Sequence, residues 1–307
     1  MKRRITFFIG IIIAVFIYYF IYFLLFLIKI NKTPLVTYIQ KELIIDKDLV
    51  VKTFKDFDNR IKYDYIVLGS SHAYRSFDPK LFENNGISMY NFGSSSQTPL
   101  NSYCLLKKLL PYTDNFILEI YPIGFNLSGK EAFMVLANVP NTYKLLLDMS
   151  YEMKDLRAIN LLSIKPFIDH EISNRTYNYY NCQTFYKGYS LNHDSVHTRT
   201  NSKHEKLNFS IVNKQIEYLS KMIKLCNLNN KKLTFVYAPI PKSLTIAGES
   251  FFLKRIQKLS KENNCKLYDF HRMSSLHDLY DFYDSNHLNK SGVEKFNTYF
   301  IKELLTQ

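Results

Sequence analysis

Residues 65–72 read YIVLGSSH, an apolar, β-branched run that ends in glycine and two serines. A short apolar run bounded by charge and glycine is typical of a strand buried on both faces of a parallel sheet. Ser71 then lies just past the carboxyl end of this strand, where open α/β sheets bind ligands and where helix-start amides can hold an oxyanion. The stretch therefore predicts a parallel α/β sheet with a candidate nucleophile, Ser71, at its edge.

A second short segment, Asp284-Ser285-Asn286-His287, supplies the two groups that a serine nucleophile needs. An imidazole takes the hydroxyl proton, and a carboxylate holds the imidazole in the right tautomer. The segment precedes a predicted helix with one apolar face, formed by Val293, Phe296, Phe300, Ile301 and Leu304. We therefore expect Ser71, His287 and Asp284 to act as nucleophile, base and orienting carboxylate.

The order and context of these segments resemble those of SGNH (GDSL-like) hydrolases, and are most similar to the membrane-anchored branch that includes DltD-like and alginate-O-acetylation-like proteins. The resemblance covers roughly residues 62–305. It implies a three-layer α/β sandwich with a central parallel sheet, SGNH- or flavodoxin-like, after one N-terminal transmembrane helix. It also implies that the amides of Ser71 and Gly93 hold the oxyanion.

The third family block departs from the usual pattern, because the predicted strand at 116–121 offers Glu119 and no asparagine. One oxyanion donor is thus unassigned, and a missing donor costs on the order of 100- to 1000-fold in rate. Gln97 and Asn126 are the alternatives for this role. His72 and Glu119 are further candidates for the pocket, with a supporting structural role as the alternative for His72.

Strands and helices alternate along the rest of the chain, which indicates a parallel sheet with right-handed crossovers. Strands are expected at 88–92, 116–121, 233–238 and 266–270, and helices at 98–110, 210–228 and 249–263. We expect an anchor at 1–30, a stalk at 31–61 and a catalytic domain at 62–307. An insert at about 123–209 either covers the active site or shields a sheet edge.

The N-terminus carries the strongest membrane signal. Residues 5–28 hold no charge, and at about 1.5 Å per residue they are long enough to cross a bilayer core about 30 Å thick. Lys2, Arg3 and Arg4 precede this stretch, which predicts a cytoplasmic N-terminus and a catalytic domain outside the cytoplasm. A cleaved signal peptide is the competing interpretation.

The formal net charge of +13 favours an anionic polymer or anionic lipid headgroups as partner. Nucleic acid is disfavoured, because no recognition motif is present and the domain is expected to face outward. The four cysteines, Cys104, Cys182, Cys226 and Cys265, lack metal-ligand spacing, and a Cys226–Cys265 bridge stays open. His193 and His197 lack the glutamate of a zinc-protease helix. We therefore expect no metal and no other cofactor.

The acyl-serine that Ser71, His287 and Asp284 would form can react further in two ways. Transfer to a sugar hydroxyl would make the protein an O-acyltransferase that adds an acetyl-like group to a cell-surface polysaccharide. The resemblance favours this interpretation and implies a multi-pass membrane-bound O-acyltransferase as partner. Transfer to water would make it a carbohydrate or lipid esterase, and a third alternative is a non-catalytic partner that binds polysaccharide in the cleft.

Overall fold

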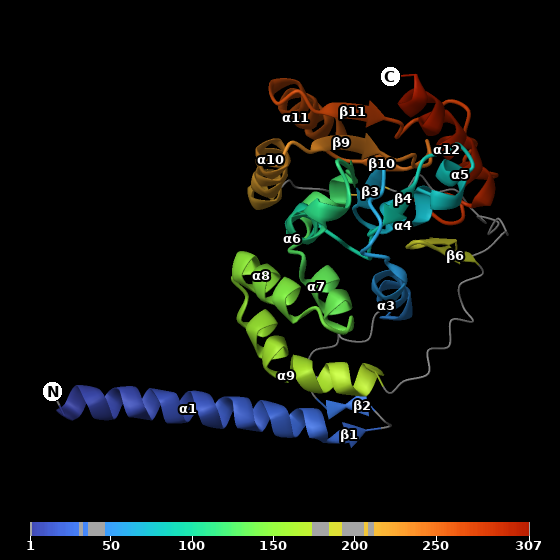
Figure 1. The fold of residues 1–307 in the computed structure, drawn as a ribbon. Coiled ribbons are helices and arrows are strands. Elements are labelled where there is room, and N and C mark those ends of the chain that lie inside the picture. Colours follow the sequence, from blue (N-terminus) through green and yellow to red (C-terminus); the bar gives the residue numbers. More distant parts are fainter. Residues whose placement is uncertain are drawn as a thin grey trace.

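The computed structural model describes residues 2–30, 33–35, 47–173, 184–191, 206–207 and 212–306. Its centre is a five-stranded sheet in the order β11-β9-β5-β3-β4 (Figure 1), in which every neighbouring pair is parallel. The strands are β3 (Tyr65–Leu68), β4 (Met89–Asn91), β5 (Asn115–Glu119), β9 (Lys232–Tyr237) and β11 (Lys266–Asp269). In chain order this is the flavodoxin-like arrangement, with the second strand outside the first. The predicted α/β fold is confirmed.

Helices cover both faces of the sheet, so the molecule has three layers. One hydrophobic cluster joins Ile66, Leu118 and Phe235 to α6 (Pro99–Leu109), α10 (Asn213–Leu228) and α11 (Glu249–Glu262). A second cluster joins the alternate strand residues Val67, Ile117 and Val236 to α4 (Ser71–Ser76), α5 (Pro79–Glu83) and α12 (Lys290–Leu305). Because successive strand residues point to opposite faces and both faces are buried, the central residues of these strands are largely apolar.

The insert region folds largely as helices on the α6 side of the sheet. Its elements are η3 (Pro122–Asn126), α7 (Lys130–Ala137), α8 (Tyr143–Met153), α9 (Leu156–Ser173) and the hairpin β6 (Thr184–Tyr186) and β7 (Tyr189–Leu191). The hairpin lies against the edge strand β4, where the Asn91 amide donates to the carbonyl of Lys187 over 2.9 Å. The hairpin thus shields the β4 edge of the sheet, and a cover of the active site by the insert stays a prediction.

The remaining elements are short or peripheral. They are β1 (Lys29–Ile30), β2 (Thr33–Pro34), α3 (Lys47–Asp56), η2 (Leu110–Tyr112), β8 (Lys206–Leu207) and β10 (Thr245–Ile246). Helix α3 falls within the expected stalk, yet its Val50 and Val51 are buried in the same core as the sheet. The expected domain boundaries stay predictions. Cys182, His193 and His197 lie outside the described residues.

The first helix, α1 (Lys2–Leu27), projects from the domain (Figure 1). Among the described residues it is long and apolar enough to cross a membrane from Arg3 to Leu27. Its last turns pack on α9, with Tyr22 and Phe26 buried in the core and the Tyr18 hydroxyl accepting from Asn160 Nδ2 over 2.6 Å. By length and composition, a retained anchor and a signal peptide both fit this helix.

Candidate active site

The turn between β3 and α4 fixes the position of Ser71. Gly69 has a φ of +143°, and a Cβ there would come within 2.7 Å of the Glu119 Cβ, so only glycine fits. Ser70 is the N-cap of α4, and its hydroxyl accepts from the His72 amide over 3.2 Å. Ser71 is therefore the first residue of the helix, at the carboxyl end of β3, as the sequence predicts.

The structure brings Ser71, His287 and Asp284 into contact. His287 Nε2 lies 2.8 Å from Ser71 Oγ, and His287 Nδ1 lies 2.8 Å and 3.0 Å from the two Asp284 carboxylate oxygens. Asp284 Oδ1 also accepts from the amides of Asn286 and His287, over 3.0 and 2.8 Å. The carboxylate is thus held by its own loop, and it holds the ring in turn. The catalytic roles of the three residues stay predictions.

The electrostatics of the site leave His287 neutral and Asp284 ionised near pH 7. Burial lowers the pKa of His287, with the positive charge of Arg75 acting in the same direction and the Asp284 hydrogen bond opposing both. For Asp284, burial alone would raise the pKa, but hydrogen bonds from His287 and the loop amides hold it below its usual value. His287 Nδ1 therefore carries the proton, and Nε2 can accept the Ser71 hydroxyl proton.

Arg75 is a member of this site that the sequence reasoning missed. Its guanidinium Nη1 lies 3.7 Å from Asp284 Oδ2, and it stands four residues after Ser71 on α4. The signal for it was this spacing, since residues four apart share one face of a helix. Arg75 reinforces the negative charge on Asp284 and, by its own charge, disfavours the protonated form of His287.

His72 ties together the two segments that carry the site. Its buried ring lies between Tyr121, with ring centres 3.9 Å apart, and His287, at 4.8 Å. Its Nε2 donates to the Asn286 carbonyl over 3.0 Å, so α4 is fastened to the loop that holds His287. Burial, and after it the neighbouring His287, lower the pKa of His72 well below its usual value. These contacts fit the supporting role that was its alternative in the sequence, and the role of His72 stays a prediction.

Gly93 does not occupy the position that the resemblance implies. Its amide donates to Asn91 Oδ1 over 2.9 Å, and a Cβ there would lie 2.7 Å from the Tyr74 nitrogen. Because its donor is engaged and its backbone is pressed against α4, the structure gives Gly93 a packing role in place of the expected oxyanion role. The loop that holds Gly93 has two further backbone amides, those of Ser95 and Ser96, that donate no hydrogen bond within the described residues. The amide of Ser71 is likewise unpaired.

Glu119 and Gln97 form the floor beneath the nucleophile turn and do not line an open pocket. Glu119 is 4% exposed, and its Oε2 accepts from the Ser70 amide over 3.0 Å and from the Ser70 hydroxyl over 2.8 Å. Gln97, in the amide orientation that satisfies both its ends, accepts from the Gly69 amide over 3.0 Å. Burial raises the pKa of Glu119 to about 7, against the two hydrogen bonds from Ser70. Asn126 is exposed at the end of η3, and we assign it no role.

The cysteines take no part in this site. Cys104, Cys226 and Cys265 are free thiols, so the Cys226–Cys265 bridge that the sequence left open is not formed. Burial raises the pKa of the Cys104 and Cys226 thiols to about 12, which makes them unreactive near neutral pH. The part of the chain that the structure describes holds no group of three or more His, Cys, Asp or Glu side chains suited to a metal ion.

No protein-family model matches the chain, and no curated protein does either. The chain is similar to a solved structure described as a lipolytic protein of the G-D-S-L family from Desulfitobacterium hafniense DCB-2. The identity is 11% and the TM-score 0.43, over 78% of this chain and 98% of that one. It is also similar to a GDSL-like lipase from Bacteroides thetaiotaomicron VPI-5482, with 9% identity and a TM-score of 0.39, over 88% and 97% of the two chains. We base no functional argument on likeness this remote.

Proposed function

We propose that this protein is a serine-dependent acyl-transfer enzyme of the SGNH type. The observation that carries the proposal is the hydrogen-bonded series from Ser71 Oγ to His287 Nε2 and from His287 Nδ1 to Asp284. This series has the nucleophile, base and orienting acid in the order that acyl transfer needs. Ser71 is partly exposed, so a carbonyl carbon can reach its oxygen.

In the first half-reaction, Ser71 Oγ attacks the carbonyl carbon of an ester or thioester while its proton passes to His287 Nε2. The negative charge on the carbonyl oxygen is held by the Ser71 amide together with a donor from the Ser95–Ser96 turn. Asp284 stabilises the imidazolium that forms. Collapse of the tetrahedral intermediate then breaks the bond to the leaving group, which takes the proton from His287, and an acyl-Ser71 remains.

In the second half-reaction, an acceptor hydroxyl gives its proton to His287 and attacks the carbonyl carbon of the acyl-Ser71. Collapse of this second intermediate breaks the bond to Ser71 Oγ, which takes the proton back from His287, and the acylated acceptor leaves. We propose that the acceptor hydroxyl belongs to a cell-surface polysaccharide and that the acyl group is acetyl-like. Two features support this choice: the apolar helix α1, which we take as a retained anchor, and the resemblance of the sequence to membrane-anchored acetylation proteins. Burial of Tyr22 and Phe26 against the domain supports retention of α1, since cleavage would expose that surface.

We further propose that the N-terminus is cytoplasmic, that the domain lies outside, and that a multi-pass acyltransferase supplies the acyl group. The basic residues at the start of α1, Lys2, Arg3 and Arg4, support this orientation.

The experiment that tests the chemistry uses the full chain in detergent with p-nitrophenyl acetate. We expect hydrolysis and a transient acetyl adduct on Ser71 by mass spectrometry, both lost in Ser71→Ala and both kept in the surface control Ser128→Ala. The pKa of His287 is lowered from 6.5, so kcat/KM should rise with pH through a midpoint below 6.5 and then stay level. Equal activity of Ser71→Ala and the wild type would refute the proposal.

The experiment that tests the acceptor compares polysaccharide acetylation in cells with the wild-type gene, a deletion and Ser71→Ala. Loss of acetyl groups in both mutants indicates transfer, and accumulation indicates an esterase. An unchanged polysaccharide would exclude both for this class of polymer.

A further inference from the structure

Helix α1 is too short to cross a bilayer by its free part alone. Its contacts with α9 begin at Tyr18, whose hydroxyl meets Asn160, and continue through the buried Tyr22 and Phe26. The apolar residues before that contact, 5–17, would span only about 20 Å, whereas the hydrocarbon core is about 30 Å thick. If α1 crosses the membrane, the turns that pack on α9 must complete the crossing, and the domain must touch the bilayer there.

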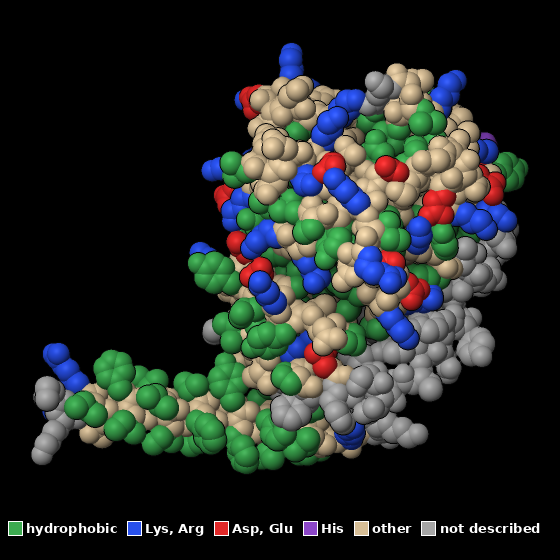
Figure 2. All heavy atoms as spheres, viewed as in Figure 1, with side chains coloured by type: hydrophobic (Ala, Val, Ile, Leu, Met, Phe, Trp, Pro, Cys, Tyr) green, Lys and Arg blue, Asp and Glu red, His purple; other side chains and the backbone are tan. Residues whose placement is uncertain are grey.

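Helix α8 lies at this place. It packs against α9, and in Figure 1 it stands on the side of the domain toward the N-terminus of α1. Figure 2 shows hydrophobic side chains all along the visible face of α1 up to the domain. The outer surface of α8 is therefore on the side of the domain from which α1 projects, with α9 between the two helices.

The exposed surface of α8 has the composition of a membrane-interface helix. Tyr143, Leu147 and Tyr151 are 47%, 48% and 78% exposed, and their spacing of four puts them on one face. Ile159 of α9 is 43% exposed as well. A row of large apolar and aromatic side chains, some of which end in a polar hydroxyl, is typical of helices in the headgroup region of a bilayer.

The charges of α8 are arranged to suit anionic headgroups. Its acidic side chains turn toward the domain, where Asp148 lies 3.3 Å from Lys107 and Glu152 lies 3.2 Å from Lys221. Two exposed basic residues flank this row, Lys144 in the first turn of the helix and Lys154 at its C-cap. Lysines beside an apolar row can extend their ammonium groups to lipid phosphates.

We propose that Tyr143, Leu147 and Tyr151 of α8, with Ile159 of α9, form a lipid-binding face that is seated in the headgroup region of the bilayer. The occupant is lipid, because a crossing by α1 brings the domain against the bilayer at α9, and α8 packs on α9 on the side from which α1 projects. The proposal rests on the retained anchor of the proposed function and on no part of its chemistry. In this proposal the domain rests on the membrane and is not held away from it by a stalk.

The chain has no tryptophan, so single tryptophans can report the depth of this face. We would reconstitute full-length Leu147→Trp in vesicles of phosphatidylcholine and phosphatidylglycerol that carry brominated acyl chains. The matched control is Phe251→Trp on α11, where Phe251 is 64% exposed and the helix lies at the end of the domain remote from α1 (Figure 1). We expect emission at shorter wavelength and quenching by the brominated lipid for Leu147→Trp, and acrylamide quenching without lipid quenching for Phe251→Trp.

A second reporter, Tyr151→Trp, covers the case in which the first variant fails to fold, and charge reversal of Lys144 and Lys154 should weaken the lipid quenching. Reporters at 147 and 151 that are as open to acrylamide as the one at 251 would overturn the proposal. Protection that appears only when a multi-pass protein is present would overturn it too, since the occupant would then be protein. The measurement gives the same answer in a Ser71→Ala background, so it succeeds or fails independently of the acyl-transfer chemistry.

Discussion

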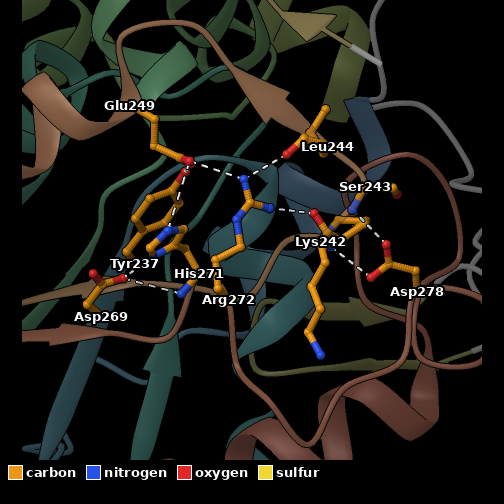
Figure 3. Close-up of polar contacts among 10 residues, drawn as sticks. Tyr237, Lys242, Ser243, Leu244, Glu249, Asp269, His271, Arg272 and Asp278 are labelled. Carbon is orange, nitrogen blue, oxygen red and sulfur yellow. Dashed lines mark hydrogen bonds and ion pairs between the residues drawn. The ribbon is translucent and has the colours of Figure 1, made fainter. Parts of the chain in front are cut away.

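Two histidines, His287 and His271, come after strands of the sheet, and each contacts an aspartate. Of the two, only His287 also contacts a serine hydroxyl. His287 has Asp284 on one ring nitrogen and the Ser71 oxygen, at 2.8 Å, on the other. His271 has Asp269 on one nitrogen and the Glu249 carboxylate, at 3.9 Å, on the other (Figure 3). The chemistry of an acid–imidazole pair is therefore set by the group at its second nitrogen.

The surroundings of His271 hold its cluster in place. The Tyr237 ring is stacked on it, with ring centres 4.9 Å apart and an angle of 11° between planes. Glu249 already accepts from the Tyr237 hydroxyl over 2.6 Å and from Arg272 over 3.1 Å (Figure 3). The Glu249 carboxylate is already hydrogen-bonded, and no nucleophilic hydroxyl lies at the second ring nitrogen of His271. We therefore expect this cluster to stabilise the fold. The Ser71 site keeps a transferable proton at its centre.

The largest expected difference is between removal of the His287 imidazole and removal of the His271 imidazole. His287→Ala should lower kcat with p-nitrophenyl acetate by about a million-fold, the size seen when the base of a serine triad is lost. His271→Ala should leave kcat/KM close to that of the wild type, because its ring contacts no residue of the Ser71 site that the structure describes. Equal losses in the two variants would break the comparison.

Substitution of each aspartate by asparagine is the next test. Asp284→Asn keeps the size of the side chain but offers an amide to His287 Nδ1, which favours the wrong tautomer. We expect kcat to fall by about ten-thousand-fold. Asp269→Asn, the matched change beside His271, should have no such effect on turnover. A small loss in Asp284→Asn, measured by steady-state kinetics on both folded variants, would mean that Arg75 or the loop alone orients the ring.

Local patterns in the sequence predict the contacts that are local in the fold. Strands such as 65–68 are apolar on both faces because helices cover both sides of the sheet, so their composition alone identifies them. The Asp284–His287 contact joins residues three apart, and a short turn makes it. Ser71 follows its strand directly. These features could be predicted from the chain.

The contacts that sequence could not supply join distant residues. His72 reaches Asn286 across 214 positions, and Glu119 reaches Ser70 across 49. The resemblance to a known family implied Gly93 as an oxyanion donor, but whether an amide is free depends on the side chain that meets it, here Asn91. Such pairings follow from how strands and loops are set side by side, which no local pattern records.

The buried Glu119 beneath the Ser71 turn should make the stability of the fold depend on pH. Glu119 is raised to a pKa of about 7, so the folded protein keeps a proton that the unfolded chain releases above about 4.5. The contribution of Glu119 to the free energy of unfolding is therefore complete below pH 4.5 and falls by about 3 kcal/mol as the pH rises to about 7.

The check is thermal unfolding of the full chain at several pH values. In Glu119→Gln the fall between pH 4.5 and 7 should disappear, while Glu249→Gln should keep it. A wild-type slope that survives in Glu119→Gln would assign the titration to another group.

The smallest expected effect tests whether the His271 cluster only stabilises the fold. Arg272 donates to the carbonyls of Pro241 and Leu244, the latter over 2.7 Å, and so fastens the loop after β9 to α11 through Glu249 (Figure 3). Hydrogen bonds from a charged group contribute about 2 kcal/mol. Arg272→Ala should therefore lower the free energy of unfolding by about that amount in a urea titration, with kcat/KM unchanged. Lys242→Ala, a neighbour whose side chain is exposed, is the matched control and should change neither quantity. A loss of turnover in folded Arg272→Ala would show that the two histidine regions are coupled, because the loop that Arg272 holds would then reach the substrate.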